Sequence, residues 1–145
     1  MRVAKNTAVT AGVRWAEYFG GREATFLSLG ARQYFRGGSV AYRLTRTSAD
    51  GQKAFYAHLV NLTIKDGGDS DGKTQLWAST GAASLARAQF DASFSGKDRA
   101  FLIQRTQPIS PSLALLISGG ISSYAAPTGR FTGTNIGLGL TADLD

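Results

Sequence analysis

Residues 40–65 read VAYRLTRTSADGQKAFYAHLVNLTIK, and this stretch decides the fold. Apolar and polar side chains alternate on both sides of Ser48-Ala49-Asp50-Gly51, a tetrapeptide typical of a tight turn. A period of two places successive side chains on opposite faces of a β-strand. We therefore predict a hairpin made of strands Val40–Thr47 and Lys53–Lys65.

The two faces of this hairpin differ in character. Val40, Tyr42 and Leu44 share one face of the first strand, while the second strand contributes apolar side chains and His58. The opposite face carries hydrogen-bond donors and cations. They are Arg43, Thr45, Thr47, Lys53, Asn61, Thr63 and Lys65. Such a face suits either a polyanion partner or ordinary solvent.

Further strands extend the pattern along the chain. Arg87–Phe94 alternates most clearly, and Asn135–Ala142 alternates Ile, Leu and Ala with Gly and Thr. Lys73–Ser79 and Ala24–Gly30 are weaker strand predictions, and 6–18 fits a strand or a short helix. The pairs Gly20-Gly21 and Gly37-Gly38 indicate hairpin turns, and 66–72 indicates an exposed turn.

Two short helices are predicted in the C-terminal third. Ser110-Pro111 resembles an N-cap followed by proline at the first helical position, which favours a helix over Ser112–Ser118. Asp98–Gln107 could form a preceding helix that Pro108 ends. Continued β-structure is the alternative for both segments. The predicted fold class is mainly β (α+β): one domain, 1–145, with an antiparallel sheet of about six or seven strands and one or two helices.

Composition narrows the function further. The chain has 145 residues, no cysteine and a net charge of +6. The absence of cysteine excludes disulfides and cysteine nucleophiles. Ten basic and three acidic residues in 1–65 give +7, whereas six basic and seven acidic residues in 66–145 give −1. A basic half favours a polyanion such as nucleic acid, although solvated surface charge is an equal alternative. No apolar stretch approaches the ~20 residues of a membrane span.

Catalytic and cofactor motifs do not emerge from the sequence. His58 is the only histidine and lies on an apolar strand face, which favours a buried or interface role. No G-x-S-x-G elbow accompanies it. Gly137-Leu138-Gly139 lacks the third glycine of a dinucleotide site. We expect no enzyme activity, no metal and no cofactor.

The order of these elements resembles the coat proteins of single-stranded RNA bacteriophages. AYRLTRTSADGQKAFYAHLVNLTI (41–64) is similar to the central hairpin of that family. RAQFDASFSGKDRAFLIQRT (87–106), followed by SPSLALLI (110–117), is similar to its last strand and helices. The resemblance covers about residues 24–118, and 121–145 would be an arm or added strand without a counterpart.

This resemblance implies a structural virion protein that self-assembles into a capsid. The subunit would be an interlocked homodimer, with the helix Ser112–Ser118 clasping the partner's sheet. A basic sheet face would contact the packaged RNA. The residues carried over to that face are Arg43, Thr45, Lys53, Asn61, Thr63 and Lys65.

A second resemblance offers an alternative. GGISSYAAPTG (119–129) and TGRFTGTNIGLGL (128–140) are similar to the glycine-rich closing strands of allene-oxide-cyclase-like and dirigent-like barrels. That resemblance implies a small β-barrel that binds or cyclises an apolar ligand. Its cavity would be lined by Tyr42, Tyr56, Trp77 and Phe90.

Overall fold

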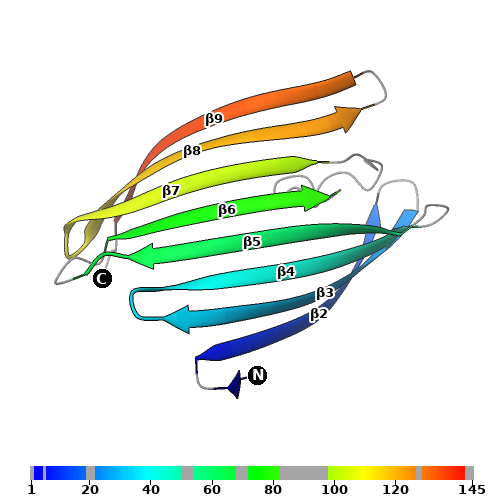
Figure 1. Ribbon diagram of the computed structural model, residues 1–145. Helices are drawn as coiled ribbons and strands as arrows, with labels where there is room; N and C mark the ends of the chain where they lie inside the picture. The colour runs from blue at the N-terminus through cyan, green and yellow to red at the C-terminus, as the bar shows by residue number, and fades with distance from the viewer. Residues whose placement is uncertain are drawn as a thin grey trace.

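The computed structural model describes residues 2–4, 6–18, 22–49, 54–67, 72–81, 98–126 and 129–142. These residues form one twisted antiparallel sheet, and none of them is helical (Figure 1). The mainly-β prediction is therefore confirmed for the described chain.

The sheet is a meander in which each strand pairs with the next one along the chain, in the order β1 to β9. Because neighbours in sequence are neighbours in space, every connection is local and the sheet keeps two edges, β1 and β9. The strands are β1 (Arg2–Ala4), β2 (Thr7–Tyr18), β3 (Arg22–Phe35), β4 (Gly38–Ala49), β5 (Phe55–Lys65), β6 (Lys73–Gly81), β7 (Arg99–Ser110), β8 (Leu113–Ala126) and β9 (Gly129–Ala142).

The predicted central hairpin is confirmed. β4 and β5 pair antiparallel, with Tyr42 opposite Val60 and Thr45 opposite Ala57. The predicted turn at Gly37-Gly38 is also present, as a two-residue connection between β3 and β4. Gly37 has a φ of 85°. A side chain would be strained there, which explains the glycine.

The two predicted helices are wrong. Ser112–Ser118 lies almost wholly in β8, and Asp98–Gln107 lies almost wholly in β7. Ser112 itself belongs to the β7–β8 turn. A helix of two turns forms few backbone hydrogen bonds. Pairing with a neighbouring strand provides hydrogen bonds to the backbone groups along a whole edge of the strand. Pro108 is tolerated because the β7–β8 register shifts between Pro108 and Ser110.

Other predictions differ in extent or lie outside the described residues. The described residues form nine strands rather than six or seven, because 7–18 is a strand and β7 and β8 replace the helices. The predicted strand Asn135–Ala142 is confirmed as part of β9. Residues 121–126 continue β8, and 129–142 form the edge strand β9. The strand Arg87–Phe94, the turn at Gly20-Gly21 and Lys53 lie outside the described residues. The interlocked dimer stays a prediction.

Few side chains of the described chain are fully buried. The buried hydrophobic residues are Ala24, Phe26 and Ala57, and the buried Thr47 lies among them on β4. Phe26 is paired with Thr47 across β3 and β4. This small cluster occupies one end of the sheet, and no second layer of described residues covers either face.

Candidate nucleic-acid interface

Strand register divides the side chains between two faces. Directly paired residues in an antiparallel sheet share a face, and the face alternates along each strand. One row of paired residues runs through Tyr42. It comprises Val9, Ala31, Tyr42, Val60, Ala78, Phe101, Ile121 and Thr134. We call the face that carries this row the apolar face, and the opposite face, which carries Arg43, the basic face.

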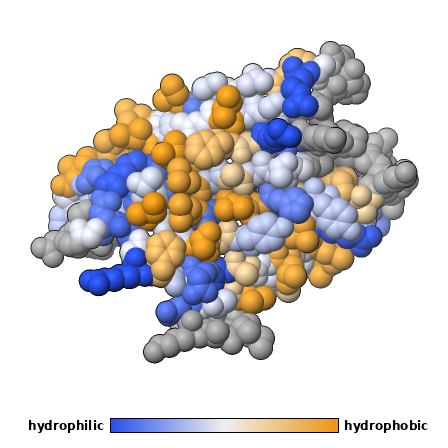
Figure 2. All heavy atoms as spheres, in the orientation of Figure 1, coloured by the Kyte–Doolittle hydropathy of each residue, from blue (hydrophilic) through white to orange (hydrophobic). Residues whose placement is uncertain are grey.

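The apolar face is covered with exposed hydrophobic side chains. Among the described residues, twenty large hydrophobic side chains are exposed, and all but Tyr34, Ile109 and Phe131 belong to this face, which leaves seventeen at 40–88% exposure. Figure 2 shows hydrophobic side chains spread over this view, from the middle of the molecule to its left margin, with hydrophilic side chains between them. Ile136, Leu138 and Leu140 on β9 are the most exposed part, at 88%, 77% and 67%.

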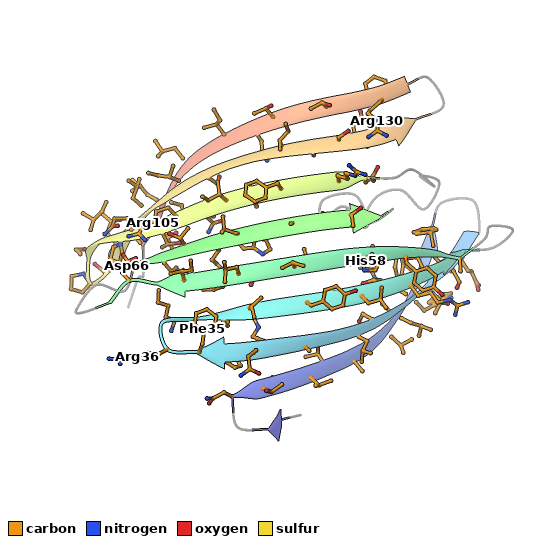
Figure 3. The ribbon with its side chains drawn as sticks, viewed as in Figure 1. Phe35, Arg36, His58, Asp66, Arg105 and Arg130 are labelled. Atoms are coloured by element: carbon orange, nitrogen blue, oxygen red, sulfur yellow. The ribbon has the colours of Figure 1, made fainter. Side chains whose placement is uncertain are left out.

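The charged groups of the apolar face lie at the ends of the strands. Figure 3 shows Arg105 beside Asp66 at one end and Arg130 at the other. Arg46, Arg99, Glu17 and Glu23 lie toward the same end as Arg130. The middle of this face therefore carries no formal charge among the described strand residues.

The basic face has the opposite composition. Among the side chains that the structure describes on this face, the charged ones are all cationic, and one lies on each of the strands β2 to β6. They are Arg14, Arg32, Arg43, Lys65 and Lys73. The strand residues described on this face include no Asp or Glu, so its described part has a positive potential.

The structure brings five of the six predicted RNA-contact residues to the basic face. Arg43 and Lys65 are exposed, Thr45 and Thr63 are half-buried, and Asn61 is 7% exposed. Asn61 Nδ2 donates a hydrogen bond to the Leu76 carbonyl at 3.2 Å, and its Oδ1 accepts one from Thr63 at 3.4 Å. The side-chain amide of Asn61 thus makes its hydrogen bonds within the sheet.

Several residues of this face escaped the sequence reasoning. Arg32 was missed because Gly30 reads as a strand end, although β3 continues to Phe35. Arg14 was missed because 6–18 alternates poorly; its guanidinium lies 4.3 Å from the centre of the Phe26 ring. Lys73 is the first residue of the predicted strand Lys73–Ser79. The alternation of faces along that strand could have placed its side chain on the basic face.

A hollow of about 270 Å³ lies in the basic face, over β2 to β6. Its base is formed by the small residues Gly30 on β3 and Ala41 on β4. Across these two strands, Ala41 is paired with Arg32 and Gly30 with Arg43, so an arginine stands beside each small residue. The residues that line it are Ala8, Thr10, Gly30, Ala31, Arg32, Ala41, Tyr42, Arg43, Leu59, Asn61 and Trp77.

The two arginines of the hollow are held differently. Arg32 Nη1 donates a hydrogen bond to Ser39 Oγ at 3.3 Å, and Ser39 is only 4% exposed. Arg43 has no acidic partner among the residues that the structure describes. The Arg32 guanidinium is therefore anchored to the sheet, whereas Arg43 is exposed.

His58 does not form a catalytic group with its described neighbours. It is exposed on the apolar face, and its Nδ1 lies 2.7 Å from the Tyr42 hydroxyl. The predicted burial is wrong for the single chain, and the interface role stays a prediction. The cavity of the barrel alternative is not assembled either, because Tyr42 and Tyr56 lie on the apolar face and Trp77 on the basic face.

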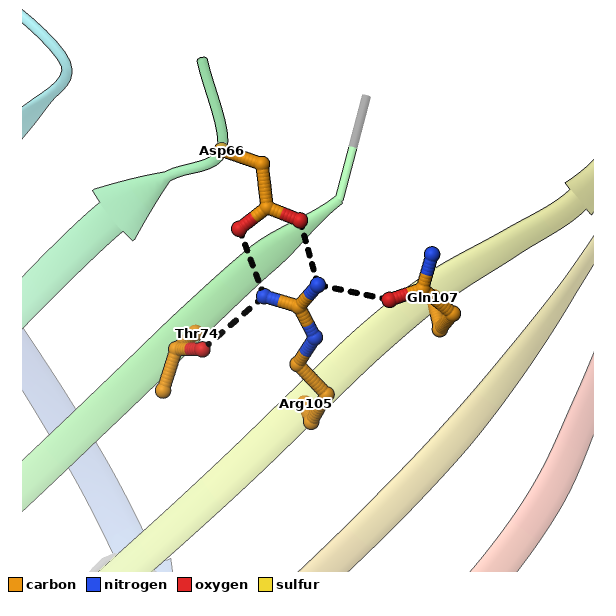
Figure 4. A network of polar contacts seen from close by, with 4 residues as sticks. All are labelled: Asp66, Thr74, Arg105 and Gln107. Carbon is orange, nitrogen blue, oxygen red and sulfur yellow. Dashed lines mark hydrogen bonds and ion pairs between the residues drawn. The ribbon is translucent and has the colours of Figure 1, made fainter. Parts of the chain in front are cut away.

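A polar cluster fastens the β5–β6 connection to β7 (Figure 4). Arg105 donates hydrogen bonds to both carboxylate oxygens of Asp66, with Nη1 to Oδ1 at 2.7 Å, and also to Thr74 and Gln107. Hydrogen bonding to Asp66, with a smaller contribution from its charge, raises the pKa of Arg105. The Asp66 carboxylate is thus engaged by the Arg105 guanidinium.

The described residues include no group of three or more His, Cys, Asp or Glu placed to hold a metal ion. Within the same residues, no helix is long and apolar enough to cross a membrane.

No family model and no solved structure matches this chain. The likeness to phage coat proteins therefore depends on residue pattern, and its helices are absent from the described part of the chain.

Proposed function

We propose that this protein is a self-assembling structural subunit, a virion coat protein, that contacts packaged RNA through its basic face. The observation that carries the proposal is the division of one open sheet into an apolar face and a basic face. We assign the protein no enzymatic role, because its candidate residues suit binding rather than reaction.

The basic face supports the nucleic-acid part of the proposal. Arginine and lysine neutralise phosphates and release the counterions condensed on them, which supplies most sequence-independent affinity. Five cations without a described acid on the same face provide that term. The hydroxyls of Thr45 and Thr63 add hydrogen-bonding capacity beside them.

The apolar face supports the assembly part. Seventeen large side chains at 40–88% exposure amount to an apolar area on the order of 1,000 Å², above the ~800 Å² that each partner gives to a standard interface. Soluble monomers rarely expose apolar patches this large, because water contact is unfavourable. We propose that other copies of the chain cover this face in a homodimer and in the larger assembly.

Purification of the recombinant protein tests both parts. We expect particles by electron microscopy and co-purifying RNA by ultraviolet absorbance, released by nuclease and by high salt. A small monomer by light scattering, with no bound nucleic acid at low salt, would refute the proposal.

A further inference from the structure

We propose that His58 makes the covering of the apolar face sensitive to pH: its imidazole is neutral where two copies of the chain meet, and its protonation separates them. This inference rests on the proposed function, in which other copies cover the apolar face. It goes further by naming the side chain through which mild acid releases the subunits.

His58 lies within a hydrophobic part of the apolar face. It is exposed on β5 in the single chain (Figure 3), opposite Leu44 on β4 and Thr80 on β6. Its neighbours along β5 on the same face are Tyr56 and Val60, which are 52% and 42% exposed. A copy that covers these two hydrophobic side chains also covers the imidazole between them.

The imidazole is held against the sheet through one of its two nitrogens. His58 Nδ1 lies 2.7 Å from the Tyr42 hydroxyl on β4, and the two ring centres are 6.0 Å apart. A neutral imidazole has one donor and one acceptor nitrogen, whereas an imidazolium has two donors and no acceptor. Protonation therefore places a positive ring, with a second N–H donor, beneath the covering copy.

The described charges around His58 oppose its protonation. On the apolar face, Arg46 of β4 is opposite Tyr56, the next residue to His58 on this face, and Arg99 of β7 is opposite Thr80. The other titratable groups that face the imidazole are the hydroxyls of Tyr42 and Tyr56, and the described residues of β4 to β7 include no Asp or Glu. A covered imidazolium would thus have cations but no described carboxylate near it, and burying an unpaired charge is strongly unfavourable.

Mild acid favours the separated subunits, because they bind the proton more tightly. Histidine is the side chain that changes charge between pH 5 and 8, and His58 is the only histidine. In a separated subunit the ring is in water and accepts the proton, whereas in the assembled protein the charged ring would be buried. Since separation takes up protons, self-association weakens as the pH falls, by up to about tenfold per pH unit for each histidine covered.

Sedimentation velocity of the intact protein at about pH 7.5 and about pH 5.5, at constant ionic strength, tests the proposal. We expect self-association to weaken by about tenfold for each histidine covered. His58→Gln has no titratable group at this exposed position and should assemble equally at both pH values. Protonation adds positive charge and strengthens the attraction to RNA, so loss of RNA contact would not explain separation in acid.

Moving the histidine distinguishes its position from its mere presence. In the His58→Gln background, Thr80→His places an imidazole on the apolar face directly opposite position 58, and this change should restore the pH dependence. Ser79→His, the matched control, places an imidazole on the basic face of the same strand and should not restore it.

The outcomes separate this inference from the proposed function. Equal assembly of the intact protein at both pH values, or dissociation of His58→Gln in acid, would overturn the role of His58 while the proposed function stands. Restoration by Ser79→His, or none by Thr80→His, would overturn it as well. If the intact protein does not assemble even at about pH 7.5, the proposed function fails and this inference fails with it.

Discussion

The two faces of this sheet are made by the same strands, yet they differ in nearly every property. On β5, Tyr56 is 52% exposed, Val60 42% and Ile64 45%, whereas their neighbours Ala57 and Asn61 are 6% and 7% exposed. The more hydrophobic face is thus the more exposed one in a single chain. A domain normally packs two layers around its apolar side chains, so we propose that another copy of the chain covers the apolar face.

The basic face is also uneven from one side of the sheet to the other. Its cations lie on β2 to β6, whereas the described residues of β7 to β9 carry none on this face. β9 alternates Ile136 and Leu138 with Gly137 and Gly139. We propose that nucleic-acid contact is concentrated over the N-terminal strands.

The largest expected effect comes from a charge in the middle of the apolar face. Val60→Asp should abolish assembly, because burying an unpaired carboxylate costs several kcal/mol, or more than a hundredfold in self-association. Sedimentation velocity would show the loss as small species. Ser79→Asp, on the basic face of the adjacent strand, is the control, and its assembly should persist. Unchanged particles from Val60→Asp would contradict the assignment of this face.

The next effect compares two arginines of one strand that lie on opposite faces. Arg43→Ala should weaken RNA binding by roughly five- to tenfold and lower the salt slope by about 0.7, since one phosphate contact is lost. Arg46→Ala, on the apolar face of β4, should leave RNA affinity nearly unchanged. RNA affinity measured over a range of salt concentrations gives both effects. Equal losses of affinity in the two variants would show that the position of the charge on one face or the other does not matter.

A smaller effect tests the turn that sets the register of both faces. Gly37→Ala should destabilise the protein by about 1 kcal/mol, because alanine is strained at a positive φ. Chemical denaturation would give the change in unfolding free energy. Gly67→Ala serves as a control, since a Cβ there meets nothing within 4 Å. Equal stability of the two variants would argue against the β3–β4 turn as described.

The smallest expected effect concerns the polar cluster at the β5–β6 connection. Arg105→Lys keeps the charge but loses the paired hydrogen bonds to Asp66, so the melting temperature should fall slightly. Arg99→Lys, on the same strand without this partner, should not change it. A fall of equal size in both variants would mean that the cluster adds nothing specific.

The sequence was sufficient to predict the faces where alternation is uninterrupted. Residues 40–65 alternate through two strands, and their five described candidate contacts share one face. In this region the side-chain type shows directly which face a residue lies on, because one face is apolar and the other polar.

Prediction failed where glycine and proline interrupt the alternation. Gly30 lies within β3, and Pro108 lies in β7 beside a register shift. Such residues usually end elements, and only pairing with a neighbouring strand shows that the strand continues. The hollow could not be foreseen either, because it depends on Arg32 lying opposite Ala41, a register that composition does not specify.

Single-cysteine labelling of adjacent residues on β6 tests the two-faced sheet most directly, since the natural chain has no cysteine. In assembled protein, we predict that a thiol at Ala78→Cys on the apolar face stays protected from a maleimide before and after nuclease treatment. A thiol at Ser79→Cys on the basic face should become reactive only once the nucleic acid is removed. Equal reactivity at both positions under both conditions would contradict the account.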